Sequence, residues 1–333
     1  MKAIVYDRYG PADVLRMAVL PTPQPGKAEV LVRVTASSVT TADWRLRAAA
    51  FPGVLAVPGR LMFGLFGPRN NVLGGVFAGQ VQEVRDDVTA FRPGDRVFGV
   101  SGGGAHAEYL TISQDATIIH TPDRVSDAEA AALPFGALSA LVFLRDFAKL
   151  KPGQSVLIVG ASGGVGSYAV QIAKRMGAQV TGVASAVNHP LLTELGADKV
   201  VDYHRTDFTK ANSAYDVVFD TVGATNFRRI RSALKPEGLF IPLNFGMREV
   251  WQALWSGMRG GKRIRIGVSG DTRPDLEQLV AWLKDGTLRP VVDSIHPMDN
   301  AREAHRAVET RHSRGTVVLQ IAEPMSGTVS GAA

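Results

Sequence analysis

The chain has 333 residues, of which 45% are hydrophobic, and this length exceeds what one hydrophobic core usually organises, so we expect two domains. The formal net charge is +6, from basic residues that are spread along the chain. Because nucleic-acid binding usually needs a concentrated basic face, we expect no nucleic-acid partner. The sequence contains no cysteine, which excludes disulfides, thiolate catalysis and cysteine-ligated zinc.

The first part of the chain is predicted to be rich in β-strands. Residues 2–6 are typical of a strand rather than of a signal peptide, and no uninterrupted apolar run is long enough to span a bilayer. We therefore expect a cytoplasmic protein without a membrane partner. Residues 29–34 alternate with period two, and residues 92–99 are typical of a turn that feeds a strand. Residues 47–71 fit either a wall of the substrate cleft or a long surface excursion.

Between about residues 120 and 290 the pattern changes to alternating strands and helices, which predicts a parallel sheet with helices on both faces. An apolar strand at 155–159 leads into a cluster of glycines, and a helical pattern follows at once. Bare amide groups at the start of a helix attract anions, and glycine lets a diphosphate approach the backbone closely. We assign the diphosphate site to Ala161, Ser162, Gly163, Gly164, Val165 and Gly166.

Two later strands, predicted at 215–220 and 238–243, supply further cofactor contacts. In open parallel sheets, ligands lie beyond the carboxyl ends of the strands. The residues that follow these two strands, and that we expect to touch the cofactor, are Thr221, Val222, Asn244 and Phe245. The helix after the second strand carries Trp251, Leu254 and Trp255, which fit a lid, a dimer contact or a buried helix face. Residues 290–323 return to short elements, and we expect the tail 324–333 to be disordered.

Several segments, in their order along the chain, together resemble the medium-chain dehydrogenase/reductase superfamily, in its zinc-free quinone-oxidoreductase branch. They are residues 36–43, 73–79, 91–99, 104–109, 150–153 leading into the glycine turn, and 195–203. The resemblance implies an α/β fold with a GroES-like, β-rich catalytic domain formed by residues 1–119 and completed by residues 290–323. It implies a Rossmann domain, a doubly wound parallel sheet that binds NADP, over residues 120–289. It also implies a homodimer.

The choice of nicotinamide cofactor depends on the end of the strand predicted at 179–184. Dinucleotide folds that take NAD usually place a carboxylate there to hold the ribose, and this chain has Ser185. Since a carboxylate would repel a 2′-phosphate, we expect NADPH rather than NADH. In the family, the residues that match Ser185 and Tyr203 form the phosphate pocket with a basic residue, whose place is taken here by Val187. Asn188, His189 and Arg205 are the candidates to compensate. The alternative for Ser185 is a helix cap.

The resemblance also bears on metal binding and on the nicotinamide end of the site. The positions that hold catalytic zinc in related alcohol dehydrogenases carry Thr40, Gly75 and Val76, so we expect no zinc. Ser139 matches a family threonine beside the nicotinamide ring, and its alternative is a buried helix serine bonded to its own backbone. His106 is predicted to be a surface or strand histidine.

Without a metal, nothing stabilises the alkoxide that alcohol oxidation requires, whereas a quinone or an α,β-unsaturated carbonyl spreads the incoming charge onto its own oxygen. We therefore expect a zinc-independent, NADPH-dependent oxidoreductase that acts on a small electrophilic acceptor of this kind. Two alternatives stay open: an alcohol dehydrogenase or enoyl reductase of the same superfamily, and a catalytically silent NADPH-binding sensor.

Thr40 and Asp43 are the candidate catalytic residues. The hydroxyl of Thr40 either bonds the acceptor oxygen or serves a turn, and quinone reductases of this branch commonly carry asparagine there. Asp43 is either a participant in the site or a helix cap or ion-pair partner.

Overall fold

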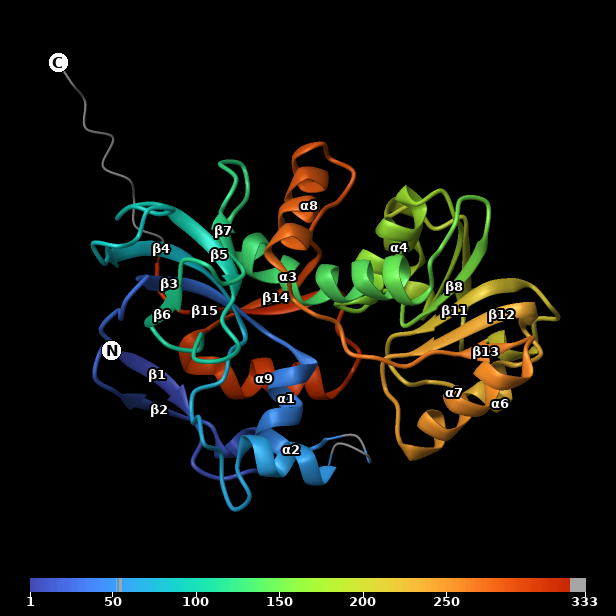
Figure 1. The fold of residues 1–333 in the computed structure, drawn as a ribbon, viewed down its shortest axis with the longest axis horizontal. Helices are drawn as coiled ribbons and strands as arrows, with labels where there is room; N and C mark the ends of the chain where they lie inside the picture. The colour runs from blue at the N-terminus through green and yellow to red at the C-terminus, as the bar shows by residue number, and fades with distance from the viewer. Residues whose placement is uncertain (52, 54–55, 324–333) are drawn as a thin grey trace.

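A computed structural model of the chain describes residues 1–51, 53 and 56–323, and it shows two halves that are each built on a separate sheet (Figure 1). The tail expected over residues 324–333 lies outside the described part of the chain. The predicted fold class, a GroES-like β-rich part joined to a doubly wound parallel sheet, is confirmed. The domain limits near 119 and 290 stay a prediction.

The first half is organised around a seven-stranded sheet that draws strands from both ends of the chain. The strands lie in the order β14-β15-β3-β4-β5-β7, with β6 also paired to β3. Their bounds are β3 Glu29–Val39, β4 Val76–Val84, β5 Arg96–Val100, β6 Tyr109–Ser113, β7 Ile118–His120, β14 Val292–Pro297 and β15 Thr316–Gln320. A separate antiparallel pair, β1 Lys2–Val5 and β2 Arg16–Val19, flanks this sheet. Since β15 pairs with the C-terminal end of β3, the C-terminal segment is an integral part of the sheet.

The second half is a six-stranded sheet in which every pairing is parallel. The order is β10-β9-β8-β11-β12-β13. Their bounds are β8 Ser155–Val159, β9 Gln179–Ala184, β10 Lys199–Asp202, β11 Tyr215–Asp220, β12 Leu234–Pro242 and β13 Arg263–Ile264. From β8 the chain winds one way through β9 to β10 and then returns to the other side through β11, so the order reverses between β8 and β11. A sheet of this kind binds ligands at that reversal, beyond the carboxyl ends of the strands.

Helices cover both sheets and the boundary between them (Figure 1). Their bounds are α1 Thr41–Ala48, α2 Ala56–Phe63, α3 Asp127–Val142, α4 Gly166–Arg175, α5 His189–Glu194, α6 Phe227–Ile230, α7 Met247–Arg259, α8 Arg273–Lys284 and α9 Ala301–Glu309. One cluster of apolar side chains fills the space between α3, α4 and the parallel sheet, and a second fills the β-rich half. The interpretation of α7 as a buried helix face is wrong, because Trp251, Leu254 and Trp255 are all more than half exposed.

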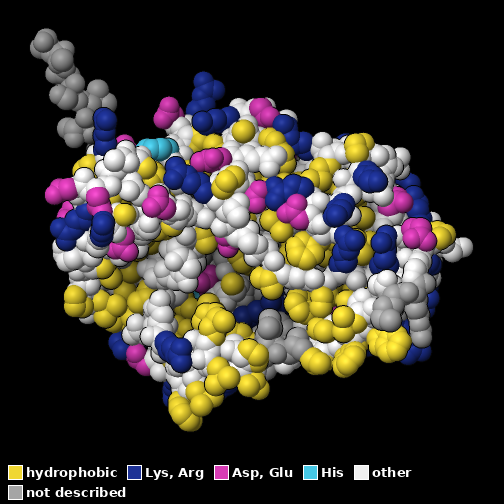
Figure 2. Space-filling view, viewed as in Figure 1, with side chains coloured by type: hydrophobic (Ala, Val, Ile, Leu, Met, Phe, Trp, Pro, Cys, Tyr) yellow, Lys and Arg dark blue, Asp and Glu magenta, His cyan; other side chains and the backbone are white. Residues whose placement is uncertain are grey.

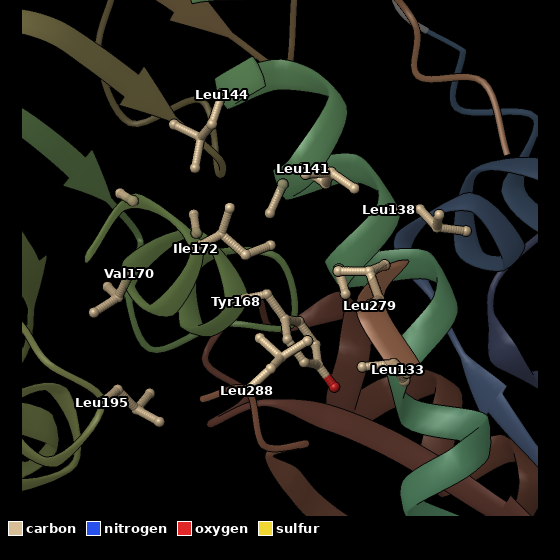
Figure 3. Packing of buried hydrophobic residues seen from close by; sticks show 14 of the residues in the cluster. Leu133, Leu138, Leu141, Leu144, Tyr168, Val170, Ile172, Leu195, Leu279 and Leu288 are labelled. Carbon is tan, nitrogen blue, oxygen red and sulfur yellow. The ribbon is translucent and has the colours of Figure 1, made fainter. Parts of the chain in front are cut away.

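Helix α3 joins the two halves. Its leucines Leu133 and Leu141 lie on the side of α4 and α8 in the core, whereas Leu138 points away from α4 (Figure 3). The same helix contacts β3, β4 and β15 of the other sheet. Together with the π-helical turn Phe143–Phe147, it is the one helical stretch in the described residues that is long and apolar enough to cross a membrane. Since 78% of its apolar window is buried inside the molecule, the stretch is typical of a core helix.

Candidate active site

The glycine turn between β8 and α4 is built as a backbone cradle. Gly160 adopts a left-handed conformation, with φ of 75°, and its carbonyl accepts the amide of Gly163 at 3.1 Å. The amides of Gly164, Val165 and Gly166 donate no hydrogen bond within the described chain. Free amides at the start of a helix are the groups that bind a diphosphate. The turn is therefore able to hold the anion assigned to it from the sequence.

Two segments that lie far away in the sequence support this turn. The amide of Gly315, just before β15, donates to the carbonyl of Ser162 at 2.8 Å. On the other side, a β-carbon at Gly136 of α3 would lie 2.1 Å from the carbonyl oxygen of Gly164. The loop is thus held between a helix and a strand of the opposite half, which keeps its amides in place before a ligand arrives.

The structure brings Ser162, Ser185 and Asn188 together at the end of β9. The side-chain amide of Asn188 donates to both serine hydroxyls, each at 3.2 Å, so Ser185 faces the turn and makes no side-chain cap bond to the helix that follows it. Val187 is 77% exposed beside them. This group of polar side chains thus joins the glycine turn to the end of β9.

Tyr203 follows β10, whose last residue, Asp202, is in register with Ala184 at the end of β9. The Tyr203 ring is partly exposed and stacks on His204 with 4.2 Å between the ring centres. Ser185 stands where NAD-binding folds usually have a carboxylate, but the structure places one, Asp202, at the end of the neighbouring strand. That carboxylate accepts the amide of His204 at 3.0 Å and lies 3.7 Å from Arg205, so it already has partners.

The loop after β11 depends on Asp220, which the sequence did not single out as a functional residue. Its carboxylate is fully buried and accepts four successive backbone amides, from Val222, Gly223, Ala224 and Thr225, at 2.7 to 3.2 Å. Burial raises the pKa of Asp220, and the four amides partly offset that shift. A carboxylate at the end of a buried strand, followed at once by a glycine-containing turn, was the available signal.

The loop after β11 is in direct contact with the glycine turn. The Thr221 hydroxyl donates to the carbonyl of Val159 at 2.8 Å, and a β-carbon at Gly160 would lie 2.5 Å from a methyl group of Val222. Thr221 and Val222, both predicted cofactor contacts, are thereby placed against the cradle.

Replacing Asp220 with alanine would leave four amides without an acceptor, whereas Asp220→Asn keeps the oxygen that three of them use. We expect Asp220→Ala to lower the free energy of unfolding by about 3 kcal/mol or more and Asp220→Asn by much less. Urea unfolding with a parallel NADPH titration checks this. Equal losses in the two variants would contradict the role assigned to the amide bonds.

Three residues were predicted to lie on the nicotinamide side of the site. Asn244, after β12, accepts a hydrogen bond from the guanidinium of Arg45 in α1. The half-buried Phe245 follows it. Ser139 of α3 is buried, and its hydroxyl lies 3.4 Å from that of Ser269. The alternative that Ser139 bonds its own backbone is therefore not what the structure shows.

Two arginines that the sequence did not single out bridge the halves at this place. Arg45 reaches Asn244, and Arg311 donates to the carbonyl of Val222 at 3.4 Å while its guanidinium lies 5.1 Å from the ring centre of Trp44. Burial and then the charge of Arg311 lower the pKa of Arg45. No carboxylate pairs with either arginine in the described chain. Figure 2 shows a hollow between the halves in which both basic and acidic side chains are visible. The two arginines without a carboxylate partner favour an anionic ligand at this place.

Beside this hollow lies a cavity of about 390 Å³ with a mainly apolar wall. It is lined by Thr40, Asp43, Leu46, Met62, Phe63, Val76 and Phe135, among others. Of the two possibilities for residues 47–71, the structure thus favours a wall of the cleft for its later part. Phe135 precedes Gly136, the residue of α3 that contacts the glycine turn, so the cavity and the turn meet at this helix.

Thr40 and Asp43 form a capping box at the start of α1. The Thr40 hydroxyl donates to one carboxylate oxygen of Asp43 at 2.6 Å and accepts the Asp43 amide at 3.3 Å. The same oxygen accepts the Thr40 amide at 2.8 Å, and the other accepts the amide of Gly74 at 2.9 Å. Both predicted catalytic residues line the cavity, and both serve the cap. Their part in the chemistry stays a prediction.

Zinc does not fit the cavity as its side chains stand. Of the three positions that would hold the metal, Thr40 is committed to its cap and Gly75 and Val76 offer no ligand atom. Within the described residues no three histidine, aspartate or glutamate side chains come together as a metal site.

The prediction that His106 is a surface or strand histidine is wrong. The side chain is completely buried, and its ring lies edge-on to that of His305 of α9, with 5.6 Å between centres. Arg47 lies beside them, fully buried, and pairs with Glu309. The helical spacing of Ala301, Ala304 and His305 was the only sequence signal that His305 faces inward.

Two family models match the chain: one for an alcohol dehydrogenase GroES-like domain over residues 26–123 and one for a zinc-binding dehydrogenase over residues 195–319. The chloroplastic quinone-oxidoreductase QR1 of Triphysaria versicolor is 32% identical, over 96% of this chain and 98% of the relative. The mitochondrial NAD(P)H oxidoreductase RTN4IP1 of Homo sapiens is 30% identical, over 96% of this chain and 89% of the relative.

The solved structure of the quinone oxidoreductase from Coxiella burnetii superposes with a TM-score of 0.85 at 31% identity, covering 97% of this chain and 99% of that one. Both halves of the fold and nearly the whole length are shared with these proteins. The chain is therefore an oxidoreductase that belongs to the medium-chain dehydrogenase/reductase superfamily, in its quinone oxidoreductase-like branch.

Proposed function

We propose that the protein transfers a hydride from NADPH to quinones or α,β-unsaturated carbonyl compounds, without zinc. The observation that carries this proposal is a diphosphate cradle that opens beside an apolar cavity whose zinc-ligand positions are Thr40, Gly75 and Val76. The names of the relatives, quinone oxidoreductase and NAD(P)H oxidoreductase, support the same reaction class.

The preference for NADPH is supported by the corner formed by Ser162, Ser185 and Asn188. Their polar side chains offer hydrogen bonds to a 2′-phosphate, and the one nearby carboxylate, Asp202, already has a backbone and a cationic partner. The net charge of +6 adds a general attraction for the more anionic cofactor.

The side chains that line the cavity position the acceptor. When bound, the nicotinamide supplies the hydride. Leu46, Val76 and Phe135 form an apolar wall that excludes water and holds a planar acceptor, and the capping box fixes the start of α1 at that wall. The acceptor oxygen takes the electron pair, so the site needs a hydrogen-bond donor but no Lewis acid.

The test is a cofactor titration followed by an acceptor screen on protein dialysed against a chelator. We expect NADPH to bind at least about tenfold more tightly than NADH, which corresponds to about 1.4 kcal/mol. We also expect reduction of benzoquinones or enones by the chelated protein. Oxidation of simple alcohols without reduction of either acceptor class would contradict the proposal. Tight NADPH binding without turnover would favour the silent sensor instead.

A further inference from the structure

The donor that the acceptor oxygen needs is not supplied by the residues that the sequence suggested. The proton of the Thr40 hydroxyl is directed at Asp43, whose two carboxylate oxygens also accept the amides of Thr40 and Gly74. Arg69 and Asn70 lie at the exposed mouth, where Arg69 bonds the carbonyl of Met62 and Asn70 holds the amide of Val72.

Tyr6 is the remaining hydroxyl in the wall of the cavity. Its ring packs in the apolar cluster of the β-rich half, its amide donates to the carbonyl of Asn71 at 3.0 Å, and the residue is only 3% exposed. The hydroxyl makes no hydrogen bond within the described chain. The hydroxyl oxygen is not completely buried. Because Tyr6 lines the cavity, this oxygen faces the cavity. A hydroxyl in a cavity wall without a protein partner is free to bond a molecule that enters the cavity.

The surroundings of Tyr6 keep it protonated. Burial raises its pKa to about 12, and the nearby charges of Tyr9 and Asp43 act in the same direction. The phenol is therefore a hydrogen-bond donor over the whole physiological pH range. Its strand is short and rigid: Ala3, Ile4 and Val5, which precede it, are all buried.

We propose that the Tyr6 hydroxyl is the hydrogen-bond donor to the acceptor oxygen in the reaction proposed above, on which this inference rests. With an enone, a hydride from NADPH forms a C–H bond at the β-carbon, the π electrons move toward the carbonyl, and the oxygen receives the electron pair as an enolate. The Tyr6 hydrogen bond stabilises that charge, Tyr6 keeps its proton, and a proton from water completes the α-carbon. NADPH is oxidised and the enone is reduced by the same electron pair.

The test is Tyr6→Phe, which removes only an oxygen that has no partner in the protein. We expect the melting temperature and the NADPH dissociation constant to stay at their wild-type values, and kcat for enones to fall about 100-fold, the usual effect of losing one oxyanion donor. Tyr9→Phe is the matched control: the neighbouring Tyr9 hydroxyl bonds the carbonyl of Gly64 outside the cavity wall, so its loss should leave kcat unchanged.

The acceptor dependence separates a chemical role from a structural one. A donor matters most where the acceptor is weakly activated, so Tyr6→Phe should lose much more rate with simple enones than with electron-poor quinones. An equal loss with both classes would indicate a structural role and overturn the assignment, as would a wild-type rate in Tyr6→Phe together with a loss in Thr40→Val. If the wild-type protein reduces neither class, the proposed function itself fails.

Discussion

Gly166→Ala is expected to weaken NADPH binding by about 100-fold or more, equivalent to about 2.7 kcal/mol. A β-carbon at residue 166 would lie 2.1 Å from the carbonyl oxygen of Gly160 and 2.7 Å from the α-carbon of Ala161. Both contacts are with backbone, so the variant must displace the turn or the start of α4. The amides that we assign to the diphosphate would move with it. Isothermal titration with NADPH, alongside thermal unfolding, measures the effect.

Gly163→Ala is the control that separates damage to the fold from loss of ligand contact. The added carbon would lie 3.4 Å from the Gly160 carbonyl, an ordinary van der Waals distance, and Gly163 is not in the left-handed region. We expect normal thermal stability. If Gly163→Ala nevertheless binds NADPH more weakly, the added carbon must obstruct a diphosphate that lies close to residue 163. Wild-type affinity in Gly166→Ala would show that the diphosphate is bound elsewhere.

Local patterns in the sequence were enough to predict the cofactor half. The strands at 179–184 and 215–220 agree with β9 and β11 residue for residue, because parallel core strands are continuous apolar runs with glycine at their ends. The glycine turn is likewise a local motif, since its residues, its strand and its helix are contiguous. The contacts predicted after β11 and β12 follow from sheet geometry alone.

The parts of the site that depend on long-range contacts were not predictable in this way. Arg45 and Asn244 are 199 positions apart, and Gly315 reaches Ser162 across the boundary between the halves. No spacing rule marks such pairs. Tyr6 was taken as an ordinary strand residue, because nothing in the sequence shows that its strand end borders a cavity.

The burial of charged and polar side chains was also not predictable from the sequence. His106 was predicted to be a surface or strand histidine and Arg47 was not singled out, since such side chains are rarely enclosed completely. The structure encloses both: Arg47 lies on α1, and His106 lies against His305 of α9, which packs on α1. Their positions are a property of the assembled β-rich half rather than of any one segment.

The buried histidines should make the protein sensitive to acid. Burial lowers the pKa of His305 well below its usual 6.5, and the charges of His106 and Arg47 lower it further. Burial also lowers the pKa of His106, although Asp43 and the Ser38 carbonyl partly oppose this. Both rings therefore stay neutral in the folded state while the unfolded chain takes up protons below about pH 6.5. Stability is then complete above that pH and is lost as the pH falls.

For each histidine that stays neutral in the folded state, the free energy of unfolding falls by about 1.4 kcal/mol for every pH unit below about 6.5. His305→Leu removes one of the two and also removes two ring nitrogens that have no hydrogen-bond partner in the described chain. We expect this variant to be more stable than the wild type at about pH 5, with a pH dependence shallower by close to one proton. Urea unfolding across the range from about pH 5 to 8 measures both quantities.

His312→Gln is the matched control, because it also removes one imidazole but does so at an exposed position outside the buried cluster. An unchanged pH dependence in His305→Leu would show that His305 is protonated in the folded protein. In that case the charge would have to be balanced within the cluster, and Asp43, which is near His106, is the carboxylate available to do so. Asp43 also caps α1, so protonation of His305 would then disturb the cavity wall before the protein unfolds. The KM for the acceptor would rise at a higher pH than the pH at which the protein unfolds.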